Sequence, residues 1–395
     1  MNSKKIYLIW LQLVFGIGSK KVKEFLDFYN GDVESLYKDG ERGWRLCGLL
    51  DNKNIDKLKN EEILNLAKKA FEKANSLDYK ILTFYDDKYP QKLKTIYNPP
   101  MVLYVSGDLG NIDDEVSISI VGTRSSTKSG LDIAANFAYD LAKNGCIIVS
   151  GGAMGIDSAA HKGAIQAGGK TISVLGCGIN YPYLPSLASM RNTISKTGAL
   201  VSEYPPDVPP QKWTFPVRNR IISGLSNGVL IVEAGVKSGS LITAEHAIDQ
   251  NRDVFAVPGS IQSPTSNGTN KLIKDGAKPV TCVEDILDEY NHVLGYNISK
   301  NNNNTNNQEI LNKLPLTSTI QSKELKNGGS HSKKLPDGIS EDAKRVYNML
   351  SKEPKHIDEI AIKCSIKPNV VLQALTELEL AGVVDSLSGR RYIKS

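Results

Sequence analysis

Cysteine and histidine are scarce in this sequence, and neither residue type forms a cluster. The five cysteines are spread along 395 residues without a CxxC pair, which argues against a structural zinc site. Cys146 and Cys177 lie in or beside apolar runs that look like strands, so we expect buried thiols. Scattered free thiols are typical of the reducing cytoplasm, where we expect this protein to be found.

The common phosphate-binding and catalytic fingerprints are absent as well. No GxGxxG follows the first expected strand and no GxxxxGK[ST] occurs in the chain, which excludes a standard dinucleotide fingerprint and a Walker A loop. No nucleophile–base pair stands at a recognisable spacing. We therefore expect neither a cofactor nor a metal, and we do not expect an enzyme.

No apolar run is long enough to span a membrane. The opening KKIYLIWLQLVFGIG has a basic start and an apolar run, but Gln12 interrupts it and no small-residue cleavage site follows. Ile6, Ile9, Trp10 and Leu13 repeat at helical spacing, which predicts an amphipathic helix. The net charge of +5 permits a polyanionic partner without requiring one.

Four segments of different character follow one another along the chain. Residues 1–75 have helical periodicity, broken by GIG at Gly16–Gly18 before a basic helix. This outline predicts either a helix-hairpin-helix (SAM-like) domain or a small helical bundle whose glycines only turn the chain. Residues 296–338 begin with an asparagine-rich stretch, which predicts a flexible linker. Residues 339–395 show three helical patterns and a short hairpin near Ser388 and Gly389, which predicts a winged helix.

Residues 76–295 alternate between apolar strands and helices. Continuous apolar runs lie at 116–121, 146–150, 171–176, 228–234 and 253–259. In the helical stretch 130–145, Ala134, Phe137 and Leu141 share one face, and Gly145 marks the C-terminal end. Fully apolar strands that alternate with helices indicate a parallel sheet covered on both faces. We predict a Rossmann-type doubly wound α/β domain.

Ligands of a doubly wound sheet bind at the carboxyl ends of its strands. The segments that follow the five apolar runs are rich in Gly, Ser and Thr, so they offer backbone N–H groups and hydroxyls to a phosphate. Arg124 and Lys237 lie on two of these strand tips, and Arg218 and Arg220 stand in FPVRNRIISG, which looks like a helix start. A helix start already carries partial positive charge, so these cations favour an anionic ligand.

Three side chains of the α/β segment are candidates for acid–base chemistry. His161 is a candidate general base, although packing or capping on the flank of a helix explains it more simply. Asp157 fits the N-cap of that helix better than a catalytic acid. Glu233 ends an expected strand, where a structural role in orienting a loop is favoured over a catalytic one.

Several stretches together resemble one known family. They are SISIVGTRSSTKSG, IIVSGGAMGIDSAAHKGAIQAGGKTISVLGCGINYPY, FPVRNRIISGLSNGVLIVEAGVKSGSLITAEHAIDQNRDVFAVPG and GTNKLIKDGA. This dense set, over about 80–290, is similar to the DprA/Smf family. The resemblance implies a protein that binds single-stranded DNA without strong sequence preference and protects it. It also implies that the protein helps to load the recombinase RecA during natural transformation, and that it forms a homodimer through the Rossmann domain.

The family binds single strands in a positive pocket at the strand tips. Its glycine–small–arginine turn falls on Gly122, Thr123 and Arg124, where this chain has Thr in place of the more usual Ser. Arg220 has an alternative role as the ion-pair partner of Glu203 or Glu233, and Phe215 is either a stacking platform for bases or a core aromatic. The resemblance implies this set of nucleic-acid-binding residues: Gly122, Thr123, Arg124, Gly151, Gly152, Lys212, Phe215, Arg218, Asn219, Arg220 and Lys237.

The predicted winged helix lacks a basic recognition helix. Its third helical stretch, 368–382, contains no Lys or Arg but does contain Glu377 and Glu379, whereas helices that read the major groove present polar and basic residues to DNA. Arg390 and Arg391 on the wing are the obvious cations. We therefore favour a protein-docking or weak accessory role over sequence-specific reading of duplex DNA.

Two other functions are compatible with this architecture. Lysine-decarboxylase-like nucleotide phosphoribohydrolases share the Rossmann fold and the glycine-rich tips, but they usually show PGGxGTxxE where this chain reads EAGVKSGSLITAEH. A winged-helix transcription regulator with a ligand-sensing α/β domain is the other alternative. Both remain open at the level of the sequence.

Overall fold

The computed structural model describes residues 2–291, 293, 339–351, 355–364, 366, 368–381, 383–387 and 391–394. These residues fall into two compact units, one within 1–307 and the other within 308–395. The predicted linker, 296–338, lies outside the described residues.

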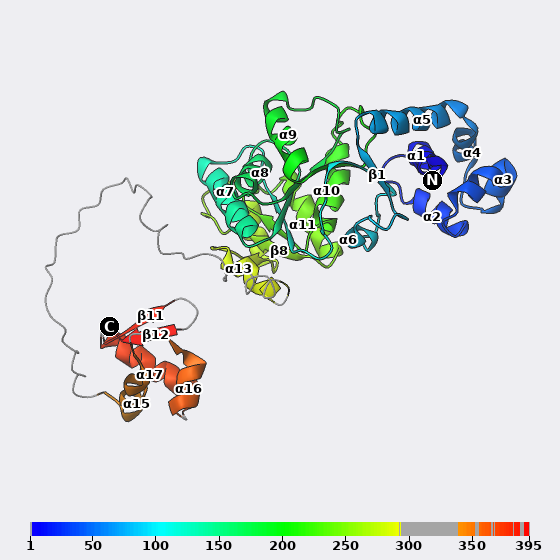
Figure 1. Ribbon diagram of the computed structural model, residues 1–395. Coiled ribbons are helices and arrows are strands. Elements are labelled where there is room, and N and C mark those ends of the chain that lie inside the picture. Colours follow the sequence, from blue (N-terminus) through cyan, green and yellow to red (C-terminus); the bar gives the residue numbers. More distant parts are fainter. Residues whose placement is uncertain are drawn as a thin grey trace. The chain divides into compact units, whose positions relative to one another are not determined.

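A nine-stranded sheet forms the centre of the first unit (Figure 1), with the strand order β1-β2-β6-β5-β4-β3-β7-β8-β9. In this order, the strands from β6 through β5, β4, β3, β7 and β8 to β9 all pair in parallel, whereas β1 and β2 add an antiparallel edge. The strands are β1 Lys80–Thr83, β2 Val102–Gly107, β3 Ser117–Val121, β4 Ile147–Ser150, β5 Thr171–Leu175, β6 Ala199–Ser202, β7 Gly228–Ile231, β8 Asp253–Ala256 and β9 Lys278–Pro279.

The five predicted strands are confirmed as β3, β4, β5, β7 and β8. Every residue of β3, β4, β5 and β7 is buried, as expected for parallel strands covered on both faces. Strands β1, β2, β6 and β9 were not predicted from the sequence. The chain builds β3 to β6 outward in one direction and then returns to add β7 to β9 on the other side of β3. This reversal between β3 and β7 is the switch point of a doubly wound sheet.

Helices cover both faces of the sheet, which confirms the predicted Rossmann-type doubly wound fold. One face packs against α10 (Thr214–Gly224) and α11 (Gly239–Asp249). The other face packs against α7 (Lys128–Lys143), α8 (Ile156–Gln166) and α13 (Glu284–Leu287). The remaining helices of this part are α6 Gln91–Lys94, α9 Ala188–Thr197 and α12 Asn267–Lys274, with 3-10 turns at Pro185–Leu187 and Asp288–Tyr290.

The predicted helix at 130–145 is α7, and its ends follow the sequence signals. Thr127 caps the N-terminus, where its Oγ1 accepts a hydrogen bond from the Gly130 N–H at 3.0 Å. Gly145 follows the C-cap with φ of 83°, a left-handed conformation that glycine adopts without strain.

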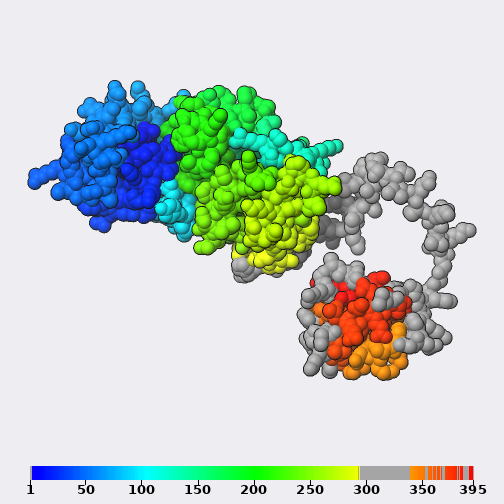
Figure 2. All heavy atoms as spheres, turned by 180° about the vertical axis from the view of Figure 1, so that it is seen from behind, coloured from blue at the N-terminus to red at the C-terminus, as the bar shows by residue number. Residues whose placement is uncertain are grey.

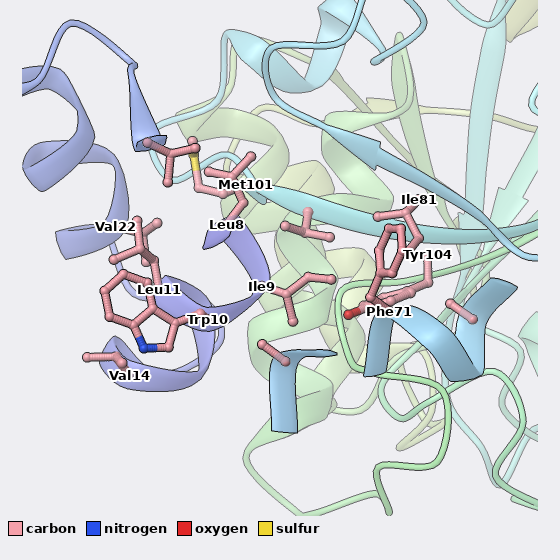
Figure 3. Close-up of a cluster of buried hydrophobic side chains, with 14 of the residues drawn as sticks. Leu8, Ile9, Trp10, Leu11, Val14, Val22, Phe71, Ile81, Met101 and Tyr104 are labelled. Atoms are coloured by element: carbon pink, nitrogen blue, oxygen red, sulfur yellow. The ribbon is translucent and has the colours of Figure 1, made fainter. Parts of the chain in front are cut away.

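Five helices form the N-terminal part of the first unit: α1 Asn2–Phe15, α2 Lys21–Phe28, α3 Val33–Leu46, α4 Asn52–Lys59 and α5 Glu61–Ser76. Their apolar faces do not form a separate core. Leu8, Ile9 and Trp10 of α1 belong to the same buried cluster as Ile81 and Tyr104 of the sheet (Figure 3). The helices therefore pack directly against the antiparallel end of the sheet. In the space-filling view, the blue atoms of the N-terminal helices lie directly against cyan and green atoms of the α/β part (Figure 2).

The second unit has the architecture of a winged helix, as predicted. Its helices are α15 Glu341–Met349, α16 Ile357–Cys364 and α17 Pro368–Leu380, and its strands are β10 Lys355–His356, β11 Val384–Leu387 and β12 Arg391–Lys394. The strands pair antiparallel in the order β10-β12-β11. Ser388, Gly389 and Arg390, predicted to form the tip of the hairpin and part of its basic wing, lie outside the described residues.

None of the helices in the described part of the chain combines the length and the apolar character needed to cross a bilayer.

Candidate functional site

A cavity of about 390 Å³ opens at the switch point of the sheet, where β3 ends and the β7–α11 loop begins. Its position is the one expected for a ligand site in a doubly wound fold. Six of the eleven residues predicted to bind nucleic acid line it: Gly122, Thr123, Arg124, Lys212, Phe215 and Asn219. Residues from four separate segments of the sequence therefore meet at one place.

The loop after β3 is held in shape by Glu233. The backbone N–H of Thr123 donates to the carbonyl of Glu233 at 2.8 Å. The Glu233 carboxylate accepts from the N–H of Thr127 at 2.9 Å and from its hydroxyl at 2.5 Å. These contacts confirm the structural role that was favoured for Glu233, although the loop that it orients follows β3 rather than β7.

Arg124 and Phe215 face each other across the cavity wall. The guanidinium carbon of Arg124 lies 4.9 Å from the centre of the Phe215 ring, a cation–π distance. The ring also lies 5.6 Å from that of Tyr183 and packs so closely on Gly176 that a Cβ there would come within 2.8 Å. Phe215 is therefore a half-buried wall residue, while Arg124 is exposed to solvent.

Arg218 lies behind the cavity and is only 4% exposed. Its Nη1 donates to the carbonyls of Gly151, at 2.5 Å, and Val174. Burial lowers the pKa of the Arg218 guanidinium, and the nearby Asp157 carboxylate opposes that shift. Arg218 therefore ties the loop after β4 to β5 through carbonyl oxygens.

The prediction that Asp157 caps α8 is wrong. The N-cap is Gly155, with φ of 84°, and Asp157 lies in the first turn of the helix. A Cβ at Gly155 would meet the carbonyl oxygens of Thr123 and Arg124 at 2.5 and 2.7 Å, so only glycine fits there. Asp157 lies on the cavity wall and its carboxylate accepts from the Ala153 N–H at 3.3 Å. Burial raises its pKa, and Arg218 opposes the shift.

Arg220 lies outside the cavity and has an internal partner. Its Nη2 contacts both carboxylate oxygens of Glu203 at 2.9 Å, and the Arg220 and Glu203 residues are only 6% and 2% exposed. Its Nε donates to the Asn98 carbonyl at 2.9 Å. The ion pair with Glu203 that was proposed as an alternative role for Arg220 is confirmed, whereas the one with Glu233 is not formed.

The remaining predicted residues border the cavity less closely. Gly151, Gly152 and Lys237 are not among its lining residues. Gly151 and Gly152 are buried. Neighbouring atoms leave no room for a side chain on Gly152, because a Cβ there would lie 2.5 Å from the Ser173 hydroxyl. Lys237 is exposed on the loop between β7 and α11.

Three hydroxyl residues at the start of α11 were not predicted individually. Ser238, Ser240 and Thr243 line the cavity, and Ser238 is the N-cap of α11, accepting from the Ser240 N–H at 3.4 Å. Positive partial charge gathers at such a helix end. The sequence shows that the segment after β7 is rich in Gly, Ser and Thr. It does not show which of these hydroxyls face the cavity, because that depends on the residue at which α11 begins.

His161 is buried completely and has a structural role. Its Nδ1 lies 2.7 Å from the Thr171 hydroxyl, which donates in turn to the Ile148 carbonyl. Its Nε2 has no hydrogen-bond partner in the described residues. Burial lowers the pKa of His161 to about 3, so the ring is neutral near pH 7. The interpretation that His161 packs on the flank of the helix is confirmed.

Within the described ranges, no group of three His, Cys, Asp or Glu side chains has the geometry to hold a metal ion. In the same ranges, Arg124, Lys212 and Lys237 form no ion pair with a carboxylate. The cavity and its rim therefore present cations, hydroxyls and the start of a helix, with the buried Asp157 as the acidic residue of the wall. The cations, hydroxyls and helix start suit a phosphate.

Residues 80–291 match the family model of DNA recombination-mediator protein A, and residues 331–390 match the DprA winged helix domain. DNA processing protein DprA of Bacillus subtilis is 46% identical over 202 residues, covering 51% of this chain and 68% of that protein. Protein Smf of Synechocystis is 30% identical over 395 residues, covering 99% of both chains. The X-ray structure of DNA processing protein A from Streptococcus pneumoniae is 35% identical with a TM-score of 0.61, covering 73% of this chain and 98% of that one.

Proposed function

This chain belongs to the family of DNA recombination-mediator protein A, and from that premise we propose that its strand-tip cavity binds single-stranded DNA. The backbone of the strand passes over the edge formed by the loops after β3 and β7 and by the segment before α10. The binding has little sequence preference, because phosphates carry no sequence information.

One observation carries this proposal: the open cavity brings Arg124 and Lys212 together with the N-terminus of α11. Neither cation has a carboxylate partner in the described part of the chain, so both charges are available to a ligand. Ser238 and Ser240 add hydroxyls at the helix start. Cations, hydroxyls and helix N-termini are the groups with which proteins contact nucleic acid phosphates.

The same contacts argue against a catalytic role. His161 is sealed in the interior with a pKa of about 3, so it cannot exchange protons with a substrate in the cavity. The Glu233 carboxylate is occupied by the N–H and hydroxyl of Thr127. These features disfavour the phosphoribohydrolase alternative, which release of free base from nucleoside monophosphates would revive.

The family also supplies the wider context of this proposal. The bound strand is protected and passed to the recombinase RecA during natural transformation, and two copies of the protein associate through their Rossmann domains. All five cysteines are free thiols, which supports a reducing, cytoplasmic setting. The winged helix takes a protein-docking or weak accessory role, because α17 carries Glu377 and Glu379 and no basic residue.

The first test measures the fluorescence anisotropy of one labelled oligonucleotide, single-stranded and then annealed, with the wild type and with Arg124→Glu. We expect the wild type to prefer the single strand, and Arg124→Glu to bind it more than a hundredfold less tightly. The loss combines a charge-assisted phosphate contact of about 2–3 kcal/mol with new repulsion. Arg391→Glu on the exposed wing is the matched control, with an expected change below threefold.

Equal losses in Arg124→Glu and Arg391→Glu would contradict the strand-tip site. Tight binding of one particular duplex would favour a winged-helix regulator instead. The salt response gives an independent check, because about four neutralised phosphates predict that log K falls with log salt at a slope of roughly −3. A flat response would argue against a site dominated by phosphate contacts.

A further inference from the structure

One of the three tryptophans is placed differently from the other two. Trp10 and Trp44 are 1% and 5% exposed in the N-terminal helices, whereas Trp213 is 50% exposed. Burying a large aromatic surface is favourable. Half of the Trp213 residue is not covered by the described chain, so part of its surface is accessible to a ligand.

Trp213 is the neighbour in sequence of a residue that lines the strand-tip cavity, although its own side chain is not among the lining residues. It follows Lys212, which lines the cavity, and it is the N-cap of α10. Thr214, the next residue, is buried, and its hydroxyl donates to the Gly176 carbonyl at 2.5 Å. Thr214 therefore anchors the start of α10 to the chain just after β5, while half of the Trp213 residue remains exposed.

The segment that presents Trp213 is rigid. Between Tyr204 and Trp213 the chain contains four prolines, which limit backbone freedom. The N–H groups of Gly178 and Asn180 donate to the carbonyls of Val208, at 2.8 Å, and Pro206, at 2.9 Å. A platform that is already ordered loses little entropy when a ligand stacks on it.

The indole itself is held at two points. Its Nε1 donates to the Gln211 side-chain oxygen, and its ring lies 6.3 Å from the Tyr204 ring at a steep angle. These contacts fix the orientation of the ring and leave half of the residue in contact with solvent.

Phe215 offers a less accessible surface for stacking. Its ring already carries the Arg124 guanidinium at 4.9 Å and packs against Gly176. A base that stacked on Phe215 would have to displace the arginine, whereas a base on Trp213 displaces only water. Phe215 lines the cavity but is half-buried, whereas Trp213, two residues earlier in the chain, is 50% exposed.

We propose that Trp213 is a base-stacking platform for single-stranded DNA, positioned to receive a nucleobase next to the phosphate held by Arg124 and Lys212. This inference rests on the proposed function of the cavity and names the residue that contacts the bases. Stacking on an indole accepts every base, since each has a π-face. A duplex cannot use this contact, because its bases are already stacked on one another, so Trp213 gives the site its preference for single strands.

Tryptophan fluorescence tests this directly, because the two buried tryptophans provide a constant background. We expect a dT oligonucleotide to quench the emission of the full-length wild type, with saturation at the concentration at which anisotropy saturates. Trp213→Phe keeps an aromatic ring, so it should bind within about threefold of the wild type but show no quenching. An unquenched wild type that binds normally would overturn the proposal.

Affinity gives the second readout. Trp213→Ala should weaken single-strand binding about tenfold, the usual effect of removing one base–aromatic stack, and leave duplex binding unchanged. Tyr97→Ala is the matched control, because Tyr97 is an aromatic residue 83% exposed and outside this cavity; we expect less than twofold. Equal losses from both substitutions would contradict a specific platform.

An oligonucleotide with abasic sites separates the stack from the phosphate contacts. The wild type should bind it about tenfold less tightly than dT, and Trp213→Ala should bind both equally.

If Arg124→Glu abolishes binding while the abasic oligonucleotide and Trp213→Ala have no effect, the DNA site stands and the stacking proposal fails. If Arg124→Glu has no effect either, the proposed function itself fails. Loss of self-association in Trp213→Ala, with DNA affinity intact, would assign the indole to a protein contact and also overturn the proposal.

Discussion

Two pairs of cations lie close together around α10, and their surroundings differ. Arg218 and Arg220, within the helix, are 4% and 6% exposed, and they are bound by the carbonyls of Gly151 and Val174 and by the carboxylate of Glu203. Arg124 and Lys212, on the loops, are exposed and have no carboxylate partner in the described residues. Arg218 and Arg220 therefore belong to the scaffold, and the neighbouring loop cations line the cavity. Burial and partner, rather than charge, separate the two roles.

The largest expected effect tests the scaffold pair. Glu203→Ala leaves Arg220 buried without its partner, which should lower the free energy of unfolding by about 4 kcal/mol. Urea unfolding followed by the fluorescence of Trp10 and Trp44, both in the first unit, measures it. Lys278→Ala removes an exposed ion pair with Glu289 and is the control, with about 0.5 kcal/mol or less expected.

DNA binding by the same variant sharpens the comparison. Below the onset of unfolding, Glu203→Ala should bind single strands as tightly as the wild type, because Arg220 lies outside the cavity. A stable Glu203→Ala protein that had lost DNA binding would break the distinction and place Arg220 with the ligand-facing cations.

An intermediate effect is expected from pH. The pKa of His161 falls from 6.5 to about 3 on folding, so the unfolded chain binds more protons between those values and stability declines as pH falls below 6.5. The loss is about 1.4 kcal/mol per pH unit, or roughly 2 kcal/mol between pH 6.5 and 5. His161→Gln should remove that part of the slope in urea unfolding at the two pH values. Identical slopes in variant and wild type would show that His161 does not titrate in this way.

The smallest effect is expected at one edge of the cavity. Lys212→Ala removes one exposed cation, which should weaken single-strand binding by about tenfold or less and reduce the salt slope by roughly 0.7. Stability should change by less than about 0.5 kcal/mol, since Lys212 has no buried contact to lose. Salt titrations of anisotropy measure both quantities. A stability loss as large as that of Glu203→Ala would mean that Lys212 belongs to the scaffold.

The strands of the parallel sheet were predictable because each is a continuous apolar run. Strand β6 (Ala199–Ser202) was missed although it is as short as β4 (Ile147–Ser150) and ends in the same residue type, so its local pattern does not explain the difference. The antiparallel edge depends on the pairing of Tyr104 with Ile81 and with Ser202, contacts between distant residues that no local pattern encodes. The shared core of the N-terminal helices and the sheet likewise depends on contacts between residues far apart in the sequence, so no local pattern predicts it.

The site was partly predictable for a similar reason. The carboxyl ends of the strands located Gly122, Thr123 and Arg124, because the fold rule applies to any doubly wound sheet. The sequence offered Glu203 as a partner of Arg220 but could not decide between that ion pair and a DNA contact, because the burial of Arg218 and Arg220 depends on packing between distant segments. The N-cap of α8 was assigned to Asp157 because Asp favours that position, but the close approach of the loop after β3 required Gly155.

The shared core of the N-terminal helices has a consequence for synthesis on the ribosome. Leu8 and Trp10 emerge first, yet their cluster includes Tyr104 and Leu200, which are made much later. At ordinary elongation rates the wait is on the order of ten seconds. During that time the apolar side chains of the first helices cannot reach the sheet residues that complete their cluster, so the N-terminal part finishes its packing only after most of the α/β part has been made.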